Sequence, residues 1–339
     1  MPAVRRRKPC EFLRVVKVLC KNGRFVPIRG DMSLLRSAFI ALSGNSLLRR
    51  FIERSTPGRR MSARFVAGFR IEDAMTVADA LHSQGLSVSL DHLGENVSTP
   101  GQAAQAAQVC HWLLDAIAPS RLNANVSVKL TQMGIDLNPD LAFENLAGLV
   151  RHAARTNSFI RVDMEGTAYT QATIDMVRRV HAVPENQGHA GIVIQAYLRR
   201  SAQDVAGLLA DGIRIRLCKG AYKEPPDLAF SAKKDVDANF VALMKMLLKS
   251  GVFHGIATHD PAMIAATKDF VRAERIDPSA FEFQMLYGIR RDLQRSLVQE
   301  GYGVRVYVPF GDEWYPYFMR RLAERPANVL FLARSLLRQ

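Results

Sequence analysis

The sequence has no run approaching the roughly 18 consecutive apolar residues that a membrane-spanning helix requires. No Gly-x-Gly-x-x-Gly follows its first predicted strand, which argues against the dinucleotide-binding Rossmann fold. It also has no His-x-x-x-His, Cys-x-x-Cys or Ser-His-Asp spacing, so we expect no metal centre and no acyl-transfer chemistry. The four cysteines are scattered, and no apolar segment with a small-residue cleavage site follows the basic N-terminus. We therefore predict reduced thiols in a cytoplasmic protein and no secretory signal.

Positive charge is concentrated at the N-terminus. Residues 1–64 hold 16 Lys and Arg against three acidic residues, a net charge of +13, whereas the other 275 residues hold 30 against 29. Such an arm could bind nucleic acid, lie on an anionic membrane or remain a solvated extension. Base stacking needs aromatic residues among the basic ones, and the only aromatics of the arm are Phe12, Phe25, Phe39 and Phe51. We expect no nucleic-acid partner, and the other two alternatives stay open.

From about residue 86 a short β-branched or apolar run, ending in polar residues, alternates with a helical stretch. The predicted strands are residues 87–91, 125–129, 159–164, 191–196, 213–219, 255–258, 281–285 and 304–308. Eight strands alternating with helices is the count of a closed parallel barrel. We predict an α/β fold, a (β/α)8 TIM barrel, regular or distorted, over residues 65–339, with the basic arm and helices of residues 1–64 outside it.

Polar side chains gather where the predicted strands end, and barrels of this kind carry their sites at those ends. They are Asp91, Lys129, Asp163, Glu165, Gln195, Arg216, Lys219, Thr258, His259 and Tyr307, with Arg320 and Arg321 in the last helix. The set is rich in cations and poor in nucleophiles. It suits a ligand with a carboxylate or phosphate and redox chemistry on a bound cofactor. Individual residues of this set could instead form salt bridges at the barrel rim, and Arg320 and Arg321 could lie on a solvent-exposed helix face.

Six segments, five at these strand ends and one in the last helix, resemble the flavin-dependent proline dehydrogenase family, in the family's order. They are residues 126–131 (VSVKLT), 161–165 (RVDME), 195–197 (QAY), 215–222 (IRLCKGAY), 257–259 (ATH) and 317–324 (YFMRRLAE). Cys218 stands where the family commonly has valine, a substitution by another small apolar side chain. The alternative is another flavin barrel, such as a methylenetetrahydrofolate reductase-like enzyme, which should lack the paired arginines after the last strand.

The resemblance implies a nucleotide-binding flavoprotein that uses FAD. Its reaction would be oxidation of L-proline to Δ1-pyrroline-5-carboxylate by hydride transfer from C5 to flavin N5, the first step of proline catabolism to glutamate. A membrane quinone would accept the electrons. The protein would be cytoplasmic, with peripheral contact on the inner face of the cell membrane as an option for the arm.

The resemblance also implies roles for the substrate-side residues. The proline carboxylate would be held by Arg320, Arg321 and Lys129, with Glu324 keeping the arginines in place. Tyr307, Tyr287 and Leu217 would surround the ring, and Asp163 would orient Lys129 as a catalytic residue.

The flavin-side residues implied by the resemblance follow the later strands. Gln195 would reach the pyrimidine edge of the flavin, and Arg216 would lie near N5 as a second catalytic residue. The remaining cofactor contacts would come from Lys219, Gly220 and Ala221 at the pyrophosphate and ribitol, Thr258 and His259 at the adenosine, and Glu165 beside the flavin.

Overall fold

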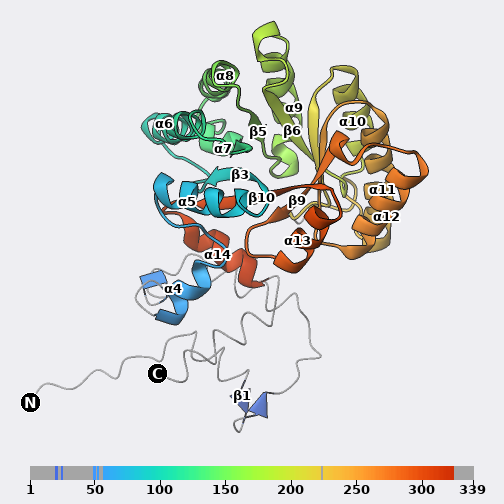
Figure 1. Ribbon diagram of the computed structural model, residues 1–339. Coiled ribbons are helices and arrows are strands. Elements are labelled where there is room, and N and C mark those ends of the chain that lie inside the picture. Colours follow the sequence, from blue (N-terminus) through green and yellow to red (C-terminus); the bar gives the residue numbers. More distant parts are fainter. Residues whose placement is uncertain are drawn as a thin grey trace, which may run out of the picture. The chain divides into compact units, whose positions relative to one another are not determined.

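Short strands alternate with helices along the chain and close into a barrel in the computed structural model (Figure 1). The structure describes residues 56–222 and 224–323, together with 20–21, 24–25, 49–50 and 52. Two compact units are present, one of residues Ala63–Trp314 and one of Met1–Ser62 with Tyr315–Gln339. The barrel lies entirely in the first of them.

All eight barrel strands are parallel to their neighbours, in the order β10-β3-β4-β5-β6-β7-β8-β9. Their bounds are β3 Ser87–His92, β4 Ala124–Val128, β5 Ile160–Val162, β6 Ala190–Gln195, β7 Arg214–Cys218, β8 His254–Ala257, β9 Phe281–Leu286 and β10 Gly303–Phe310. Each predicted strand overlaps one of these. The predicted (β/α)8 barrel is confirmed.

The helices surround the strands (Figure 1). They are α5 Ile71–His82, α6 Pro100–Ile117, α7 Leu130–Met133, α8 Pro139–Arg155, α9 Thr167–His181, α10 Ser201–Ala210, α11 Lys233–Lys249, α12 Pro261–Ala273 and α13 Arg291–Gln299. Three of them begin with proline after a capping side chain, Thr99, Asn138 or Asp260, which accepts a hydrogen bond from a backbone N–H of the first turn. Proline at this position loses no helical hydrogen bond, so sequence alone sets these helix starts.

Strand alternation separates an apolar outer face from a polar interior. On β7, Ile215 and Leu217 are fully buried in the hydrophobic core. Arg216, between them, points the other way and contacts Ser89 and Ser127 of β3 and β4 across the barrel. Because side chains alternate along a strand, polar residues two apart line the interior while apolar residues pack under the helices.

The second unit contains a two-residue antiparallel pair, β1 Cys20–Lys21 with β2 Arg24–Phe25, and helix α4 Thr56–Ser62. Helix α14, Trp314–Ala323, carries Arg320 and Arg321 in its last turn. No helix in the described ranges is long and apolar enough to cross a membrane. The division of the sequence into residues 1–64 and 65–339 stays a prediction.

Candidate active site

Lys129 is the centre of a cluster of charges at the C-terminal ends of the strands. It follows β4, and its Nζ lies 3.1 Å from Asp91 Oδ1, 3.7 Å from Glu95 Oε1 and 3.8 Å from Asp163 Oδ2. Burial disfavours its charge, but the carboxylates of Asp91, Asp163 and Glu95 outweigh burial and raise the pKa of Lys129. The chain itself therefore supplies the counterions that favour the charged form of Lys129.

Asp163, directly after β5, joins three strands through one carboxylate. Its Oδ1 is 2.8 Å from Arg216 Nη1, and its Oδ2 accepts a hydrogen bond of 2.7 Å from the Tyr307 hydroxyl. Burial, with the negative charges of Asp163 and Asp91 next, holds the pKa of Tyr307 well above its ordinary value. The phenol thus remains a neutral donor. The sequence predicted that Asp163 orients Lys129, and in the structure Asp163 contacts Arg216 and Tyr307 more closely.

Arg216 has partners that the sequence analysis missed. Its Nε donates to Gln284 Oε1 on β9, and its Nη2 lies 3.1 Å from Ser89 Oγ and 3.3 Å from Ser127 Oγ. A Cβ on Gly255 would overlap the Gln284 side chain, so the glycine of β8 leaves room for this contact. The signal was present as polar and apolar residues alternating in residues 87–91 and 281–285.

Gln284 extends the polar network down the barrel. Its Nε2 donates to Glu282 Oε1 over 2.6 Å, and the same oxygen accepts from Arg305 Nε over 2.6 Å. A continuous series of hydrogen bonds therefore connects Arg305, near the start of β10, with Arg216 and Asp163. The polar interior is hydrogen-bonded as a network, which is the condition under which buried charges are tolerated.

Gln195 and Glu165 lie at the ends of β6 and β5. The Gln195 Nε2 donates to the carbonyl oxygens of Met164 and Glu165, over 3.3 and 2.9 Å. Its Oε1 is buried and accepts no hydrogen bond from the described part of the chain. The Glu165 carboxylate accepts from Thr131 N and Oγ1, and burial raises its pKa. Gln195 therefore keeps one acceptor for a ligand, whereas Glu165 is held by Thr131.

The loop after β7 contains Lys219 and Gly220. Lys219 Nζ pairs with Asp237 and lies 2.7 Å from Asp260 Oδ2. The hydrogen bond from Lys219, followed by the opposing effect of burial, leaves Asp260 with a pKa of about 2. Gly220 has φ +109°, and a Cβ there would overlap the Tyr197 ring. Position 220 thus requires glycine, and Ala221 follows it in the same loop.

Thr258 and His259 follow β8 and have structural partners. Thr258 Oγ1 accepts a hydrogen bond of 3.1 Å from Asp260 N. The His259 Nε2 accepts one of 2.9 Å from Leu286 N, which places the ring proton of a neutral His259 on Nδ1.

The remaining predicted residues are spread over several elements. Tyr287 follows β9, donates its backbone N–H to Tyr307 O over 2.9 Å and packs on the core. Leu217 is fully buried in the same core. Arg320 and Arg321 lie on α14, where the Arg321 guanidinium is 5.2 Å from the Tyr317 ring centre. Glu324 lies outside the described residues.

The barrel therefore brings together Lys129, Asp163, Arg216 and Tyr307 within direct contact distance. Gln195 and Glu165 form a second group, and Lys219 a third with its two aspartates. The ligand roles predicted for all of these residues stay predictions. The geometry supplies a fixed, buried set of charges, a neutral phenol donor and an unused amide acceptor at the end of the barrel where sites occur.

Comparisons with known proteins agree on one family. A family model described as proline dehydrogenase matches residues 74–334. The chain is 41% identical over 307 residues to Proline dehydrogenase 1 of Bacillus subtilis, covering 90% of this chain and 100% of that protein. It is also 41% identical over 284 residues to Proline dehydrogenase of Deinococcus radiodurans, covering 82% and 90%.

A solved structure supports the fold. The crystal structure of proline utilization A from Bdellovibrio bacteriovorus has a TM-score of 0.77 to this chain at 24% identity. The match covers 86% of this chain but 36% of that larger protein. At this identity, the likeness concerns the architecture of the barrel.

Proposed function

This chain belongs to the proline dehydrogenase family, and we propose that it oxidises L-proline to Δ1-pyrroline-5-carboxylate, with FAD as its cofactor, in proline catabolism to glutamate. The observation that carries the proposal is the buried cluster of Lys129, Asp163, Arg216 and Tyr307 at the C-terminal end of the barrel. Because the chain belongs to this family, the alternative of a methylenetetrahydrofolate reductase-like flavin barrel is dropped.

Two features of the described residues fit FAD. The buried Oε1 of Gln195 accepts no hydrogen bond within the described chain, and the pyrimidine edge of a flavin carries an N–H that could donate to it. Gly220, at φ +109°, gives the loop after β7 a conformation that residues with a Cβ rarely adopt, and we assign this loop to the pyrophosphate group. The Lys219 ammonium group would then contact a phosphate oxygen in place of one of its two aspartate partners, Asp237 or Asp260. Ala221, Thr258, His259 and Glu165 complete the set that we assign to the cofactor.

When bound, FAD supplies the acceptor for the hydride that leaves C5 of proline. Arg216 provides fixed positive charge, which we assign to the flavin N5 region where electron density increases on reduction. Asp163 holds Arg216 and Tyr307 in one geometry before substrate arrives. We assign Tyr307 and Tyr287 to the substrate ring, whereas Leu217, which the resemblance placed there, packs on the outer face of β7 under the helices.

We assign the proline carboxylate to Arg320 and Arg321, with Glu324 as their support. Lys129 is a weaker candidate for the main contact because Asp91, Glu95 and Asp163 already surround its ammonium group. Guanidinium groups bind carboxylates through two parallel hydrogen bonds, which suits a substrate that must be held in one orientation.

The proposal is tested by adding L-proline to FAD-loaded protein without oxygen and following the visible flavin band. In the wild type, L-proline should bleach the flavin band, and L-valine, which lacks the ring amine, should not. Arg320→Met and Arg321→Met should each raise the KM for proline by about 10- to 150-fold with unchanged flavin content, because each removes a contact of about 1.5–3 kcal/mol.

The matched control is Arg178→Met, which removes an exposed arginine paired with Asp211 on the outer helices. It should leave KM unchanged. Failure of proline to bleach the flavin would contradict the proposed reaction, whereas an unchanged KM in both α14 variants would contradict only the carboxylate assignment.

We further propose that a membrane quinone receives the electrons and that the basic arm holds the protein on an anionic membrane surface. The arm has a net charge of +13 within residues 1–64. Basic residues contribute about 1 kcal/mol each near such a surface, within a Debye length of about 8–10 Å. The full chain should co-sediment with anionic vesicles at low salt, and a chain without residues 1–30 should bind less. Equal binding of both chains would reject this role.

A further inference from the structure

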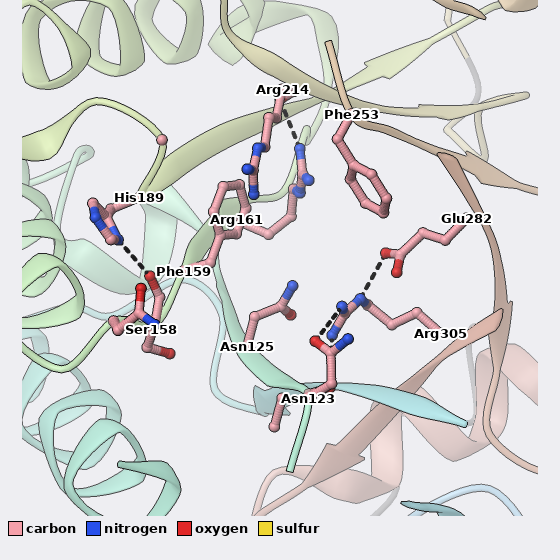
Figure 2. A pocket seen from close by; sticks show the side chains of 13 residues that line it. Asn123, Asn125, Ser158, Phe159, Arg161, His189, Arg214, Phe253, Glu282 and Arg305 are labelled. Atoms are coloured by element: carbon pink, nitrogen blue, oxygen red, sulfur yellow. Dashed lines mark hydrogen bonds and ion pairs between the residues drawn. The ribbon is translucent and has the colours of Figure 1, made fainter. Parts of the chain in front are cut away.

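A second polar site lies at the opposite end of the barrel from the candidate active site. A cavity of about 390 Å³ opens among the residues that begin the strands (Figure 2). Its lining includes Asn125, Phe159, Arg161, Arg214, Glu282 and Arg305. Nothing in the proposed reaction uses these side chains.

Arg161 of β5 is buried and points into the barrel. One of its terminal nitrogens, Nη1, donates to the carbonyl oxygens of Ile192 and Arg214, over 3.0 and 2.7 Å. Its Nε has no hydrogen-bond partner among the described residues. A Cβ on Gly191 would lie 2.6 Å from that Nη1, so the neighbouring strand is shaped to admit this arginine.

Arg214 and Asn125 complete one side of the cavity. The Arg214 guanidinium lies 5.5 Å from the centre of the Phe159 ring and 5.8 Å from that of Phe253. Asn125 is only 6% exposed and points toward the middle of the cavity in Figure 2. Its Oδ1 accepts no hydrogen bond within the described chain. An amide oxygen can only accept a hydrogen bond, so this atom calls for a water molecule, and it is the Nδ2 of Asn125 that could donate to an anion.

The charges around the cavity do not balance. It is lined by three arginines and one carboxylate, that of Glu282. Glu282 Oε1 is already contacted by Arg305 Nε and Gln284 Nε2, each over 2.6 Å. Burial and then the nearby charge of Arg216 hold the pKa of Arg161 well below its ordinary value. An anion beside the Arg161 guanidinium would favour its charged form and add negative charge to a cavity in which arginines outnumber carboxylates.

We propose that this cavity binds a small oxyanion, a carboxylate or phosphate group, through Arg161 and Arg214 with Asn125 as an additional donor. Guanidinium groups are suited to such anions because they present parallel N–H donors. The volume is at the small end of the range for ligand pockets, which suits a small anion. The Phe159 and Phe253 rings keep the Arg214 guanidinium in place.

The test is isothermal titration of FAD-loaded full-length protein with inorganic phosphate and, separately, with succinate, at constant ionic strength set by chloride. The wild type should bind at least one of the two anions saturably. Binding of phosphate alone, succinate alone or both identifies the preferred group and supports the site.

Two variants locate the binding. Arg214→Met should weaken binding at least tenfold, whereas the surface control Arg178→Met should not change it. Asn125→Asp places a negative charge in the cavity at nearly constant size, and it should abolish binding while flavin content is kept. Equal binding by the wild type and Arg214→Met, or no saturable binding of either anion by the wild type, would overturn the proposal and leave the cavity to water.

Discussion

Asp163→Asn is expected to lower the free energy of unfolding by about 3–5 kcal/mol, because it leaves the buried Arg216 without its carboxylate partner. The amide can still accept the hydrogen bond from Tyr307, but it cannot balance Arg216 and Lys129 together. Because the same carboxylate fixes Arg216 and Tyr307, kcat/KM for proline should fall by at least about 100-fold, or roughly 2.7 kcal/mol.

Urea unfolding followed by tryptophan fluorescence measures the first effect, and anaerobic flavin reduction by proline measures the second. Asp91→Asn is the matched control, because it removes one carboxylate from Lys129 and leaves Glu95 and Asp163 in place. Its loss of stability should be clearly smaller. An Asp163→Asn protein with wild-type stability and wild-type turnover would show that the Asp163 contacts contribute to neither property.

Arg216→Met is expected to shift the flavin reduction potential to a more negative value. A positive charge near the electron-accepting atoms favours the reduced form, so its removal should cost about 1.5–3 kcal/mol, or about 30–65 mV for two electrons. Substrate-analogue binding should change less than the potential. Stability should also fall by about 3–5 kcal/mol, because Asp163 loses its closest cation.

The two consequences of Arg216→Met can be separated with a double variant. Combining Arg216→Met with Asp163→Asn removes both members of the buried pair, so part of the lost stability should return. The reduction potential should not return, because the positive charge is still missing. Potentials come from spectroelectrochemical titration of the flavin-loaded proteins. If Arg216→Met keeps full flavin, a normal potential and normal turnover, Arg216 has a purely structural role at the barrel end.

The buried network explains why these two residues are expected to matter most. Asp163, Arg216, Gln284 and Glu282 belong to one series of hydrogen bonds through the barrel interior. Each substitution leaves charged partners in a site of low solvent access, where lost contacts are not replaced by water. Surface pairs such as Arg178 with Asp211 lack this property, because water replaces the lost partner.

The sequence by itself determined the barrel architecture and the end of the barrel that carries the candidate active site. Eight β-branched runs alternate with helices, and proline after Thr99, Asn138 or Asp260 sets three helix starts. These signals are local, because strand alternation and helix capping depend on residues a few positions apart. The polar residues that follow the strands could be listed for the same reason, since parallel strands end on one rim.

Only the tertiary structure decided which of those residues meet. Arg216 finds Gln284, Ser89 and Ser127 at separations of 68, 127 and 89 residues, and Lys219 pairs with Asp237 and Asp260. The polar cavity of Arg161 and Arg214 lies at strand starts, away from the strand ends where the sequence predicts a site. Alternation along a strand determines whether a side chain points into the barrel or toward the helices. Which residue it meets across the barrel depends on strand register and on the pairing of β10 with β3 that closes the barrel. Register and closure are set by the packing of the whole chain, so no local pattern in the sequence contains them.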